Sequence, residues 1–339
     1  MGTFLVSSKD LYEARYYAKD ITGLSFLVTG GAGFIGSNIV EYLLKYGAKK
    51  VRVLDNLATG RKSNLTQFEG NPSFEFINGD IRDLNTCRKT CEGIDYVSHQ
   101  AALGSVPRSI KEPENTNSVN VDGFVNMLIA AKDNGIKRFV YASSSSVYGD
   151  EKSLPKVEDK IGNPLSPYAV SKYTNELYGN VFGSVYGMQI IGLRYFNIFG
   201  PRQDPNGEYA AVIPLFVSKI MKRETVFIDG DGEQTRDFTF VENAVQANVR
   251  AMLTDNPEAS GNIYNIAVGA NFSVNTLYNN IQKLLSSDHP ATYREARKGD
   301  IRNSLADITK AKTLLAYSPT FDFSKGLAIT VEYFKEVLK

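Results

Sequence analysis

The stretch SFLVTGGAGFIG, residues 25–36, decides the fold. An apolar, β-prone run leads into glycines at positions 30, 33 and 36, and a helical pattern starts directly after them. Glycine is needed where a strand turns tightly into a helix, and the helix N-terminus then offers free amides to a phosphate group. The stretch therefore predicts the first strand–turn–helix unit of a dinucleotide-binding sheet. A plain strand–turn–helix without a ligand is the alternative.

Apolar segments alternate with helical patterns from Leu24 to about Asn197. We expect strands over residues 25–30, 51–56, 74–80, 96–101, 138–145 and 190–197. We expect helices near residues 35–47, 84–92, 116–134 and 168–187. This alternation predicts an α/β fold with a doubly wound, Rossmann-type parallel sheet.

The alternation breaks after Gly200, where strands such as VFIDG (226–230) stand among short helices and long loops. We expect this part to form a smaller C-terminal α/β lobe at the carboxyl edge of the sheet, where ligands bind in such folds. The expected domains are an N-terminal helical extension over 1–22, a nucleotide-binding domain over 23–192 with a return segment around 238–268, and a substrate lobe over mainly 193–339. In the extension, residues 8–20 predict a short amphipathic helix with Asp10 and Glu13 spaced as a capping box.

The composition excludes several classes of protein. The chain has 339 residues, with 38 Lys and Arg against 37 Asp and Glu, so no basic field favours a nucleic-acid partner. No apolar run approaches the roughly 18 residues of a membrane span. Two cysteines cannot form a disulfide framework for a chain of this size, which favours a reducing compartment. We therefore expect a cytoplasmic protein with neither a membrane nor a nucleic-acid partner.

The few cysteines and histidines predict no metal site. Cys87 and Cys91 share a helical face but have no nearby histidine, so packing is the favoured interpretation. His99 follows a strand, where a packed or backbone-bonded role is favoured over a catalytic one. His289 lies in an expected loop and suggests no role.

Asp55 closes the second expected strand, 19 residues after Gly36. A carboxylate there can accept hydrogen bonds from both adenosine ribose hydroxyls, and its charge repels a 2′-phosphate, which favours NAD over NADP. Arg61 keeps NADP open, and a simple turn role for Asp55 is the other alternative. Asp80 follows the third strand, where it could meet the adenine amino group or act only as a strand-end cap.

A hydroxyl, a phenol and an ammonium group form the candidate catalytic set. The fifth strand ends in SSSSVYG (143–149), and PYAVSK (167–172) opens a later helix. Tyr168 and Lys172 lie one turn apart on the same helical face. An ammonium beside a phenol lowers a pKa that starts near about 10, so the phenolate can take a proton from an alcohol while hydride leaves the same carbon. The spacing alone fits an ordinary helix surface, but the neighbouring serines and the glycine turn favour catalysis.

These motifs resemble a known family. TGGAGFIG (29–36), the serine run before VYG, YAVSK (168–172) and RYFNIFGP (194–201) are together similar to the extended short-chain dehydrogenase/reductases, and most similar to the UDP-hexose 4-epimerases. The resemblance covers nearly the whole chain from Leu24. It implies NAD as a tightly bound, recycled cofactor. It also implies a homodimer that pairs through the helices near 116–134 and 168–187.

The resemblance implies Ser144 as the catalytic hydroxyl, with Ser143 and Ser145 close by. Dehydratases and decarboxylases of this superfamily carry Asp or Glu in the serine cluster, whereas residues 143–146 are all serine. This difference implies a redox-neutral epimerase. Motifs and resemblance together give as expected cofactor-binding residues Gly30, Gly33, Phe34, Ile35, Gly36, Asp55, Asn56, Gly60, Asp80, Ile81, Gln100, Ala101, Ala102, Tyr168, Lys172 and Tyr195.

The resemblance also implies a clamp for a sugar nucleotide. Asn197 would bind a phosphate or the sugar, Arg236 and Arg297 would pair with the diphosphate, and residues 212–216 and 227–230 would wall the uracil. Taken singly, each arginine would be a surface charge. The expected substrate-binding residues are Gly104, Ser105, Ser144, Ser145, Tyr168, Asn197, Gln203, Ala211, Val212, Phe227, Arg236, Arg297, Asp300 and Ser304.

Ser304 stands where some plain-hexose epimerases of the family have tyrosine, which implies room for an N-acetyl group. The implied reaction interconverts UDP-GlcNAc and UDP-GalNAc, or their C6-oxidised uronic acids, through a 4-keto sugar. Asn303 departs from relatives that have histidine there. The alternatives are another NAD-dependent sugar-nucleotide oxidoreductase of the same fold, such as a dehydrogenase that releases NADH, and a non-catalytic NAD-binding protein.

Overall fold

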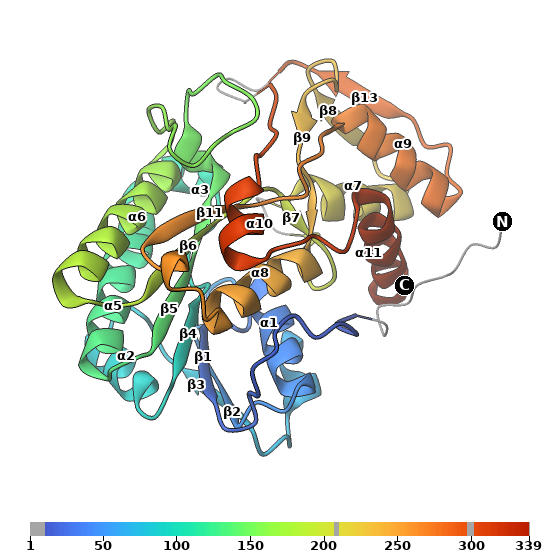
Figure 1. Cartoon of the computed structure of the whole chain (residues 1–339). Helices are drawn as coiled ribbons and strands as arrows, with labels where there is room; N and C mark the ends of the chain where they lie inside the picture. Colours follow the sequence, from blue (N-terminus) through green and yellow to red (C-terminus); the bar gives the residue numbers. More distant parts are fainter. Residues whose placement is uncertain (1–10, 207–209, 297–301, 339) are drawn as a thin grey trace.

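A seven-stranded, all-parallel sheet forms the centre of the computed structural model, which describes residues 11–206, 210–296 and 302–338. Its strand order is β11-β6-β5-β4-β1-β2-β3 (Figure 1). The bounds are β1 (Ser25–Thr29), β2 (Lys50–Asp55), β3 (Phe74–Asn78), β4 (Tyr96–His99), β5 (Arg138–Ser144), β6 (Ile190–Tyr195) and β11 (Asn262–Ile266). The expected doubly wound fold is confirmed.

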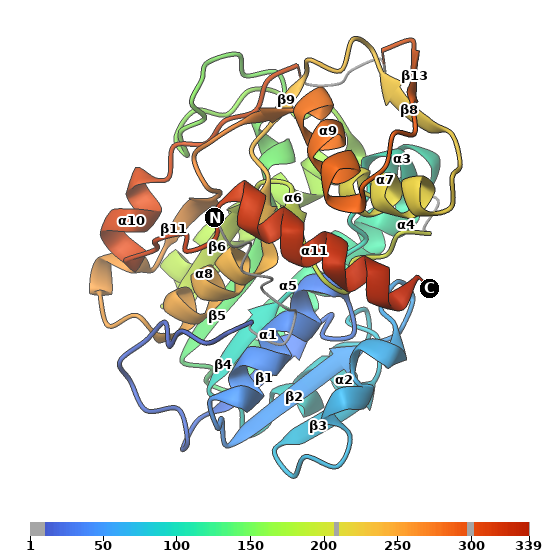
Figure 2. The same ribbon diagram turned by 90° about the vertical axis from the view of Figure 1, so that its right-hand side faces the viewer.

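Helices cover both faces of this sheet (Figures 1 and 2). On one face, α1 (Phe34–Lys45) packs against α8 (Val241–Leu253). On the other, α5 (Gly123–Asp133) packs against both α2 (Leu84–Cys91) and α6 (Pro167–Tyr186). Strands buried on both sides read as continuous apolar runs, and β1 and β6 are buried throughout.

The expected helix near 116–134 is divided into three pieces. After α3 (Val106–Lys111), the chain forms α4 (Pro113–Asn117), a π-helical turn (Ser118–Asp122) and then α5. Within the turn, the side chain of buried Asn120 bonds the backbone of Leu103 and the hydroxyl of Ser171, and so ties the helix to the loop after β4.

The chain after β6 builds a smaller part beside the carboxyl edge of the sheet. Three two-stranded sheets pair β7 with β10, β9 with β12, and β8 with β13. The bounds are β7 (Ile198–Phe199), α7 (Val212–Met221), β8 (Val226–Asp229), β9 (Thr235–Arg236), β10 (Thr239–Phe240), β12 (Phe272–Ser273), α9 (Val274–Leu285), β13 (Ala291–Arg294), α10 (Thr309–Leu315) and α11 (Phe323–Val337). Short 3-10 turns are Lys62–Asn64, Thr66–Phe68, Ser145–Tyr148 and Pro257–Ala259.

The predicted N-terminal helix over 8–20 is wrong for the part that the structure describes. Residues 11–22 form turns and irregular chain, and Tyr12 has a φ of +64°. Tertiary contacts override the helical pattern, because Tyr12 and Tyr16 are buried against Tyr42 on α1. Asp10 of the predicted capping box lies outside the described residues.

Glu242 on α8 fastens this N-terminal segment to the sheet helices. Its carboxylate accepts from the Tyr12 amide at 3.1 Å and from the Tyr16 hydroxyl at 2.6 Å. The Tyr12 hydroxyl donates to Asn38 on α1, whose own amide donates to the Phe34 carbonyl. The segment thus forms hydrogen bonds with both α1 and α8 and links the two helices.

The cysteines and His99 are packed, as the sequence suggested. Cys87 and Cys91 are buried free thiols, and burial raises the pKa of each to about 12. His99 is buried, shares a 2.8 Å hydrogen bond with the Thr29 hydroxyl, and has a pKa lowered to about 3 by burial.

The turn between β1 and α1 is closed by backbone contacts at two glycines. Gly30 has a φ of +67°, and a Cβ there would lie 2.7 Å from the Ala101 amide nitrogen. A Cβ on Gly36 would lie 2.2 Å from the Gly30 carbonyl oxygen. Any side chain at either position would push α1 away from the ends of β1 and β4.

Gly36→Ala is expected to lower the free energy of unfolding by about 1–3 kcal/mol, because the clashing atom is backbone and cannot rotate away. Gly23→Ala is the matched control, since no atom lies within 4 Å of a Cβ there. The control should leave stability within about 1 kcal/mol of the parent or slightly raise it. Urea unfolding would measure both, and equal effects would contradict the packing argument.

Tyr16→Phe is expected to destabilise the protein by about 1–3 kcal/mol, because it removes one of two donors to the buried Glu242 carboxylate. The hydroxyl of Tyr17 is buried without a hydrogen-bond partner among the described residues, so Tyr17→Phe should be neutral or stabilising. Thermal unfolding of the two variants gives the comparison. A loss of stability in Tyr17→Phe as large as that in Tyr16→Phe would refute it.

Candidate functional site

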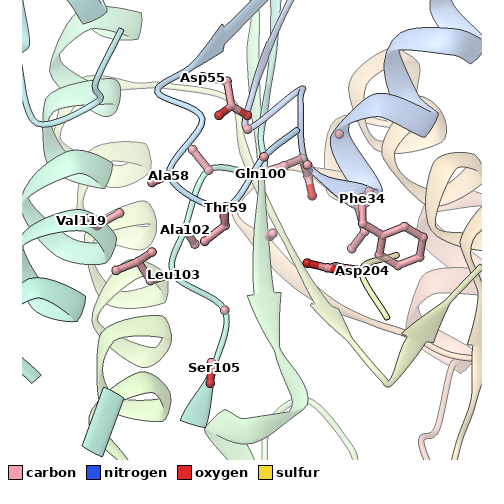
Figure 3. Close-up of a pocket in the computed structure, with 18 of the residues that line it drawn as sticks. Phe34, Asp55, Ala58, Thr59, Gln100, Ala102, Leu103, Ser105, Val119 and Asp204 are labelled. Carbon is pink, nitrogen blue, oxygen red and sulfur yellow. The ribbon is translucent and has the colours of Figure 1, made fainter. Parts of the chain in front are cut away.

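A cavity of about 680 Å³ opens at the carboxyl ends of the central strands (Figure 3). It brings together most of the residues singled out from the sequence. Its lining includes Gly30, Gly33, Phe34, Ile35, Gly36, Asp55, Asn56, Gly60, Ile81, Gln100, Ala101, Ala102, Gly104, Ser105, Ser144, Ser145, Tyr168, Lys172, Tyr195, Asn197, Gln203 and Ala211.

The glycine turn forms one wall of this cavity at the N-terminus of α1. Gly33 is the N-cap and makes no side-chain cap bond, so no side chain competes for the first amides of the helix. Unsatisfied amides and the positive end of the helix dipole suit a diphosphate. The cradle therefore fits the central part of a dinucleotide.

Asp55 is held at the end of β2 next to that cradle. Its carboxylate accepts from the Ala32 amide at 3.0 Å and from the Leu57 amide at 2.8 Å, and burial raises its pKa. A Cβ on Gly60 would lie 2.9 Å from both carboxylate oxygens, so glycine leaves that side of the acid open. A carboxylate retains lone pairs after two such bonds, which suits ribose hydroxyls.

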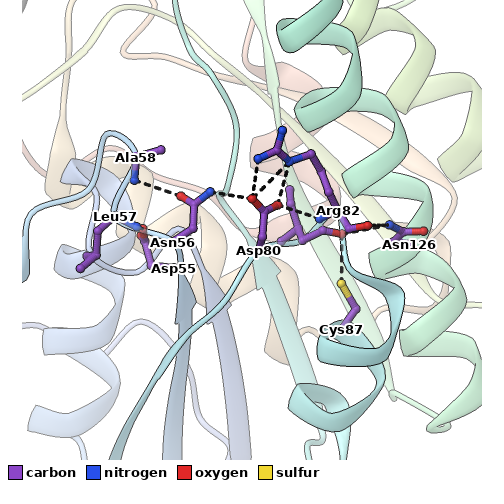
Figure 4. Close-up of polar contacts among 9 residues, drawn as sticks. Asp55, Asn56, Leu57, Ala58, Asp80, Arg82, Cys87 and Asn126 are labelled. Atoms are coloured by element: carbon purple, nitrogen blue, oxygen red, sulfur yellow. Dashed lines mark hydrogen bonds and ion pairs between the residues drawn. The ribbon is translucent and has the colours of Figure 1, made fainter.

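Asp80 is not among the residues that line the cavity, although its neighbours Gly79 and Ile81 are. Its carboxylate binds Arg82, with Nη2 to Oδ2 at 2.7 Å, and accepts from the Asn56 side chain at 2.9 Å (Figure 4). These donors lower the pKa of Asp80 to about 2. The structure therefore uses Asp80 to hold the loop after β3, and places Gly79 and Ile81 at the cavity.

Ser144, Tyr168 and Lys172 meet at the other end of the cavity. Ser144 ends β5, and Tyr168 lies in the first turn of α6, which is capped by the Ser166 side chain. Burial raises the pKa of Tyr168, and a hydrogen bond with Ser144 partly offsets the rise. Burial lowers the pKa of Lys172 to about 8.

The expected lowering of the Tyr168 pKa by Lys172 is wrong for this structure. The Lys172 ammonium lies 6.0 Å from the centre of the phenol ring and donates to the Ala142 carbonyl at 2.8 Å. Desolvation of the phenol outweighs an ammonium at this distance that is already bound elsewhere.

A buried ion pair behind these groups was missed by the sequence analysis. Glu176, one helical turn after Lys172, accepts from the Ser143 hydroxyl at 2.6 Å and pairs with Arg194 on β6 at 2.8 Å. Ser143 is thereby committed to a structural bond, whereas the Ser144 hydroxyl interacts with Tyr168 and offsets part of the rise in the pKa of its phenol. The four-residue spacing from Lys172 was the available signal.

A second cavity of about 260 Å³ adjoins the first, since Asn197 and Ala210 line both. The further residues singled out from the sequence that line it are Val212, Leu215, Phe216, Phe227, Ile228, Asp229 and Arg236. Lys219 and Arg294 line it as well and were missed, because only the pairing of β13 with β8 brings Arg294 to this place.

Among the expected substrate residues that the structure describes, Ser304 is the one that lines neither cavity. Arg297 and Asp300 lie outside the described residues. Ser304 donates its amide to the Thr235 carbonyl at 3.2 Å and borders the β9 strand, and the Thr235 hydroxyl donates to the neighbouring Asn303 side chain. The structure thus pairs this segment with Thr235, the residue before Arg236, and does not place Ser304 in the wall of either cavity.

The described residues contain neither a membrane-spanning helix nor a cluster of potential metal ligands. Across 11–206, 210–296 and 302–338, no helix is long and apolar enough to cross a membrane. In the same ranges no three His, Cys, Asp or Glu side chains are grouped so that they could hold a metal ion.

Comparison with known proteins places this geometry among sugar-nucleotide enzymes. A "Putative UDP-glucose 4-epimerase" from Methanocaldococcus jannaschii is 40% identical over 311 residues, which cover 91% of this chain and 98% of the relative. A UDP-N-acetylglucosamine 4-epimerase from Methanobrevibacter ruminantium, solved with UDP-N-acetylmuramic acid, is 40% identical, with a TM-score of 0.88 over 93% of this chain and 99% of that one.

A UDP-glucuronic acid 4-epimerase from Bacillus cereus, solved with UDP-glucuronic acid and NAD, is 34% identical, with a TM-score of 0.86 over 93% of this chain and 100% of that one. The model of the NAD dependent epimerase/dehydratase family matches residues 26–267. That match spans the sheet, the glycine turn and the Ser144–Tyr168–Lys172 set. The chain belongs to the NAD dependent epimerase/dehydratase family, and its cofactor is NAD.

Proposed function

We propose that this protein is a UDP-sugar 4-epimerase that interconverts the C4 epimers of a UDP-N-acetylhexosamine, UDP-GlcNAc with UDP-GalNAc or their uronic acids. The observation that carries the proposal is one continuous cavity with a dinucleotide cradle at one end and Ser144, Tyr168 and Lys172 at the other. The likeness to several sugar-nucleotide 4-epimerases supports it.

NAD, when bound, supplies a reversible hydride acceptor, and its positive charge favours the phenolate form of a nearby tyrosine. Tyr168 then takes the proton of the sugar O4, through or beside the Ser144 hydroxyl, and returns it when the 4-keto sugar is reduced on its other face. Lys172 carries a positive charge behind the phenol, held by its bond to the Ala142 carbonyl, and would orient the ribose of a bound cofactor. Every proton that leaves the sugar thus comes back from the same phenol.

The carboxylates support epimerisation over dehydration. Among the described lining residues of the larger cavity, the acids are Asp55 and Asp204, and Asp204 is paired with Arg61 at 2.5 Å. Glu176 is occupied by Ser143 and Arg194. Within the described part of the lining, no unpaired acid lies beside the serine run to remove a proton from C5, which elimination requires. A dehydrogenase of the same fold and a non-catalytic NAD-binding protein remain the alternatives.

The surroundings of the sugar support an N-acetylated substrate. Small residues are part of the cavity lining, among them Gly104, Ser105 and Ala211. A Cβ on exposed Gly104 would meet no atom within 4 Å, so no side chain of the protein obstructs a substituent at this place. The adjoining cavity offers Arg236 and the Phe227 ring to a diphosphate and a uracil. The 4-keto sugar must rotate to present its other face, which requires tight binding of the nucleotide and few contacts to the sugar.

Proton NMR of the purified protein with UDP-GlcNAc and no added NAD would test the proposal. We expect a new galacto-type anomeric signal, no accumulation of NADH, and slower conversion of UDP-glucose. The uronic acids and a sample with added NAD separate a C6-oxidised substrate from lost cofactor. Failure with every N-acetylated sugar, while UDP-glucose is converted, would overturn the substrate class. Accumulating NADH would favour the dehydrogenase.

Tyr168→Phe should reduce kcat by about 10²–10⁴-fold and leave UDP binding within about threefold, because only the proton-transfer group is removed. Tyr178→Phe, on the same helix but exposed, is the control and should retain activity. Stopped-assay NMR rates and calorimetric UDP affinities are the two readouts. Activity near that of the parent in Tyr168→Phe would remove the phenol from the mechanism.

We also propose a homodimer through α6. Val170, Leu177, Val181 and Val185 on this helix are all about half exposed or more, and the last three follow one another at four-residue spacing. No exposed large apolar side chain of the described residues belongs to α5, so the helix near 116–134 contributes less to this face than the sequence suggested. An unpartnered apolar stripe on one helix suits the same stripe of a second copy in an antiparallel pair.

Val181→Arg is expected to convert the dimer to a monomer, because two guanidinium groups would be buried next to each other in a symmetric interface. Val337→Arg on α11 is the matched control, since both valines are 52% exposed. Light scattering after size exclusion gives the mass of each variant. A parent protein that is already monomeric would rule out the interface.

A further inference from the structure

The arginines near Asp55 are each paired with an acid. Arg61 and Arg82 line the cavity beside the ends of β2 and β3. Arg61 Nη2 lies 2.5 Å from Asp204 Oδ1, and Arg82 Nη2 lies 2.7 Å from Asp80 Oδ2. An arginine near the acid that binds the ribose is the group that accommodates the 2′-phosphate of NADP in dinucleotide-binding sheets. The structure therefore contains candidate cations for NADP, but both are already occupied.

Arg61 is anchored close to the ribose acid. The Ala32 amide donates to the Asp55 carboxylate at 3.0 Å, and the Ala32 carbonyl accepts from the Arg61 amide at 2.9 Å. The same residue thus fixes both the carboxylate and the start of the arginine side chain. With its reach, the Arg61 guanidinium can meet a phosphate carried on a ribose at Asp55.

Asp204 comes to this place from a distant part of the chain. It belongs to the loop after β7, and Figure 3 draws it near Phe34, on a different side of the cavity from Asp55. The loop is held in place because Gln203 donates its amide to the Gly200 carbonyl and its side chain to the Ile198 carbonyl. The Asn206 amide donates to Asp204 itself at 2.9 Å.

We propose that Asp204 is a specificity-determining residue for the cofactor, which occupies the Arg61 guanidinium and so denies a 2′-phosphate its cation. Asp55 repels that phosphate, and Asp204 removes the group that would compensate for the repulsion. The two acids thus select NAD in different ways. The role of Asp204 concerns the cofactor alone and is independent of which sugar is the substrate.

The second arginine is occupied even more firmly. Arg82 contacts both carboxylate oxygens of Asp80 through Nε and Nη2, at 2.7 to 3.2 Å, and Asn56 donates to the same acid (Figure 4). A bidentate guanidinium–carboxylate pair is stronger than a single contact. The Arg61–Asp204 pair is half exposed, with 47% and 40% of the side chains accessible, so it is the one that a competing phosphate or a substitution can open.

The variant Asp204→Asn tests whether the Arg61–Asp204 pair limits NADP⁺ binding. We expect the Kd for NADP⁺ to fall about tenfold, the effect of one charge-assisted contact, while the Kd for NAD⁺ changes less than threefold. Isothermal titration calorimetry of protein freed of bound nucleotide measures both constants without any assay of turnover. The same titrations on an Asp55→Asn background remove the repulsion that would otherwise limit NADP⁺ binding.

Two controls make the result specific. In the double variant Arg61→Ala/Asp204→Asn the gain for NADP⁺ should vanish, because no guanidinium is released. Asp255→Asn removes the same charge from a side chain that is 86% exposed beside Lys19, away from Arg61 and Asp204, and should leave both constants unchanged. A gain in either background that needs Arg61 supports the proposal. The proposal is overturned if Asp204→Asn improves NADP⁺ binding in neither background, or if the improvement persists in the double variant.

Discussion

The close approach of α1 to the ends of β1 and β4 is the constraint on which the rest of the molecule depends. Gly36 packs directly against the Gly30 carbonyl, and Gly30 packs against the Ala101 amide. This packing places the first amides of α1 at the cavity. The same packing brings Ala32 to Asp55 and Arg61. A side chain at either glycine would displace the cradle, the ribose acid and the loop after β2 together.

Charge in this protein is arranged as pairs, and the pairing decides what remains available for chemistry. Glu176 binds Arg194 and Ser143, Asp80 binds Arg82, and Asp204 binds Arg61. Among the described residues at the catalytic end, the Tyr168 phenol and the Lys172 ammonium form no ion pair with an acid. Burial raises the pKa of the Tyr168 phenol, which favours its protonated form, and lowers the pKa of Lys172, which favours its neutral form. The protonation state of both groups therefore depends on what binds in the cavity.

Local patterns in the sequence predicted the sheet well and the N-terminal segment badly. The six expected strands correspond to β1–β6, because each is a short segment rich in apolar and β-branched or aromatic residues with a turn at its end. The helix expected over 8–20 does not form in its described part, because burying Tyr12 and Tyr16 against Tyr42 stabilises an irregular path more than a helix would.

The sequence by itself determined the fold class and predicted the glycine turn, Asp55 and the Tyr168–Lys172 pair, since each depends on spacing within one strand–turn–helix unit or one helical turn. Ser144 was chosen among its neighbouring serines only by the family resemblance. Only the tertiary structure decided which of the charged residues are free. Glu176 meets Ser143, Arg61 meets Asp204, and Arg294 enters the second cavity through contacts between segments far apart in the chain. Such contacts depend on the packing of the whole chain, which no local spacing encodes.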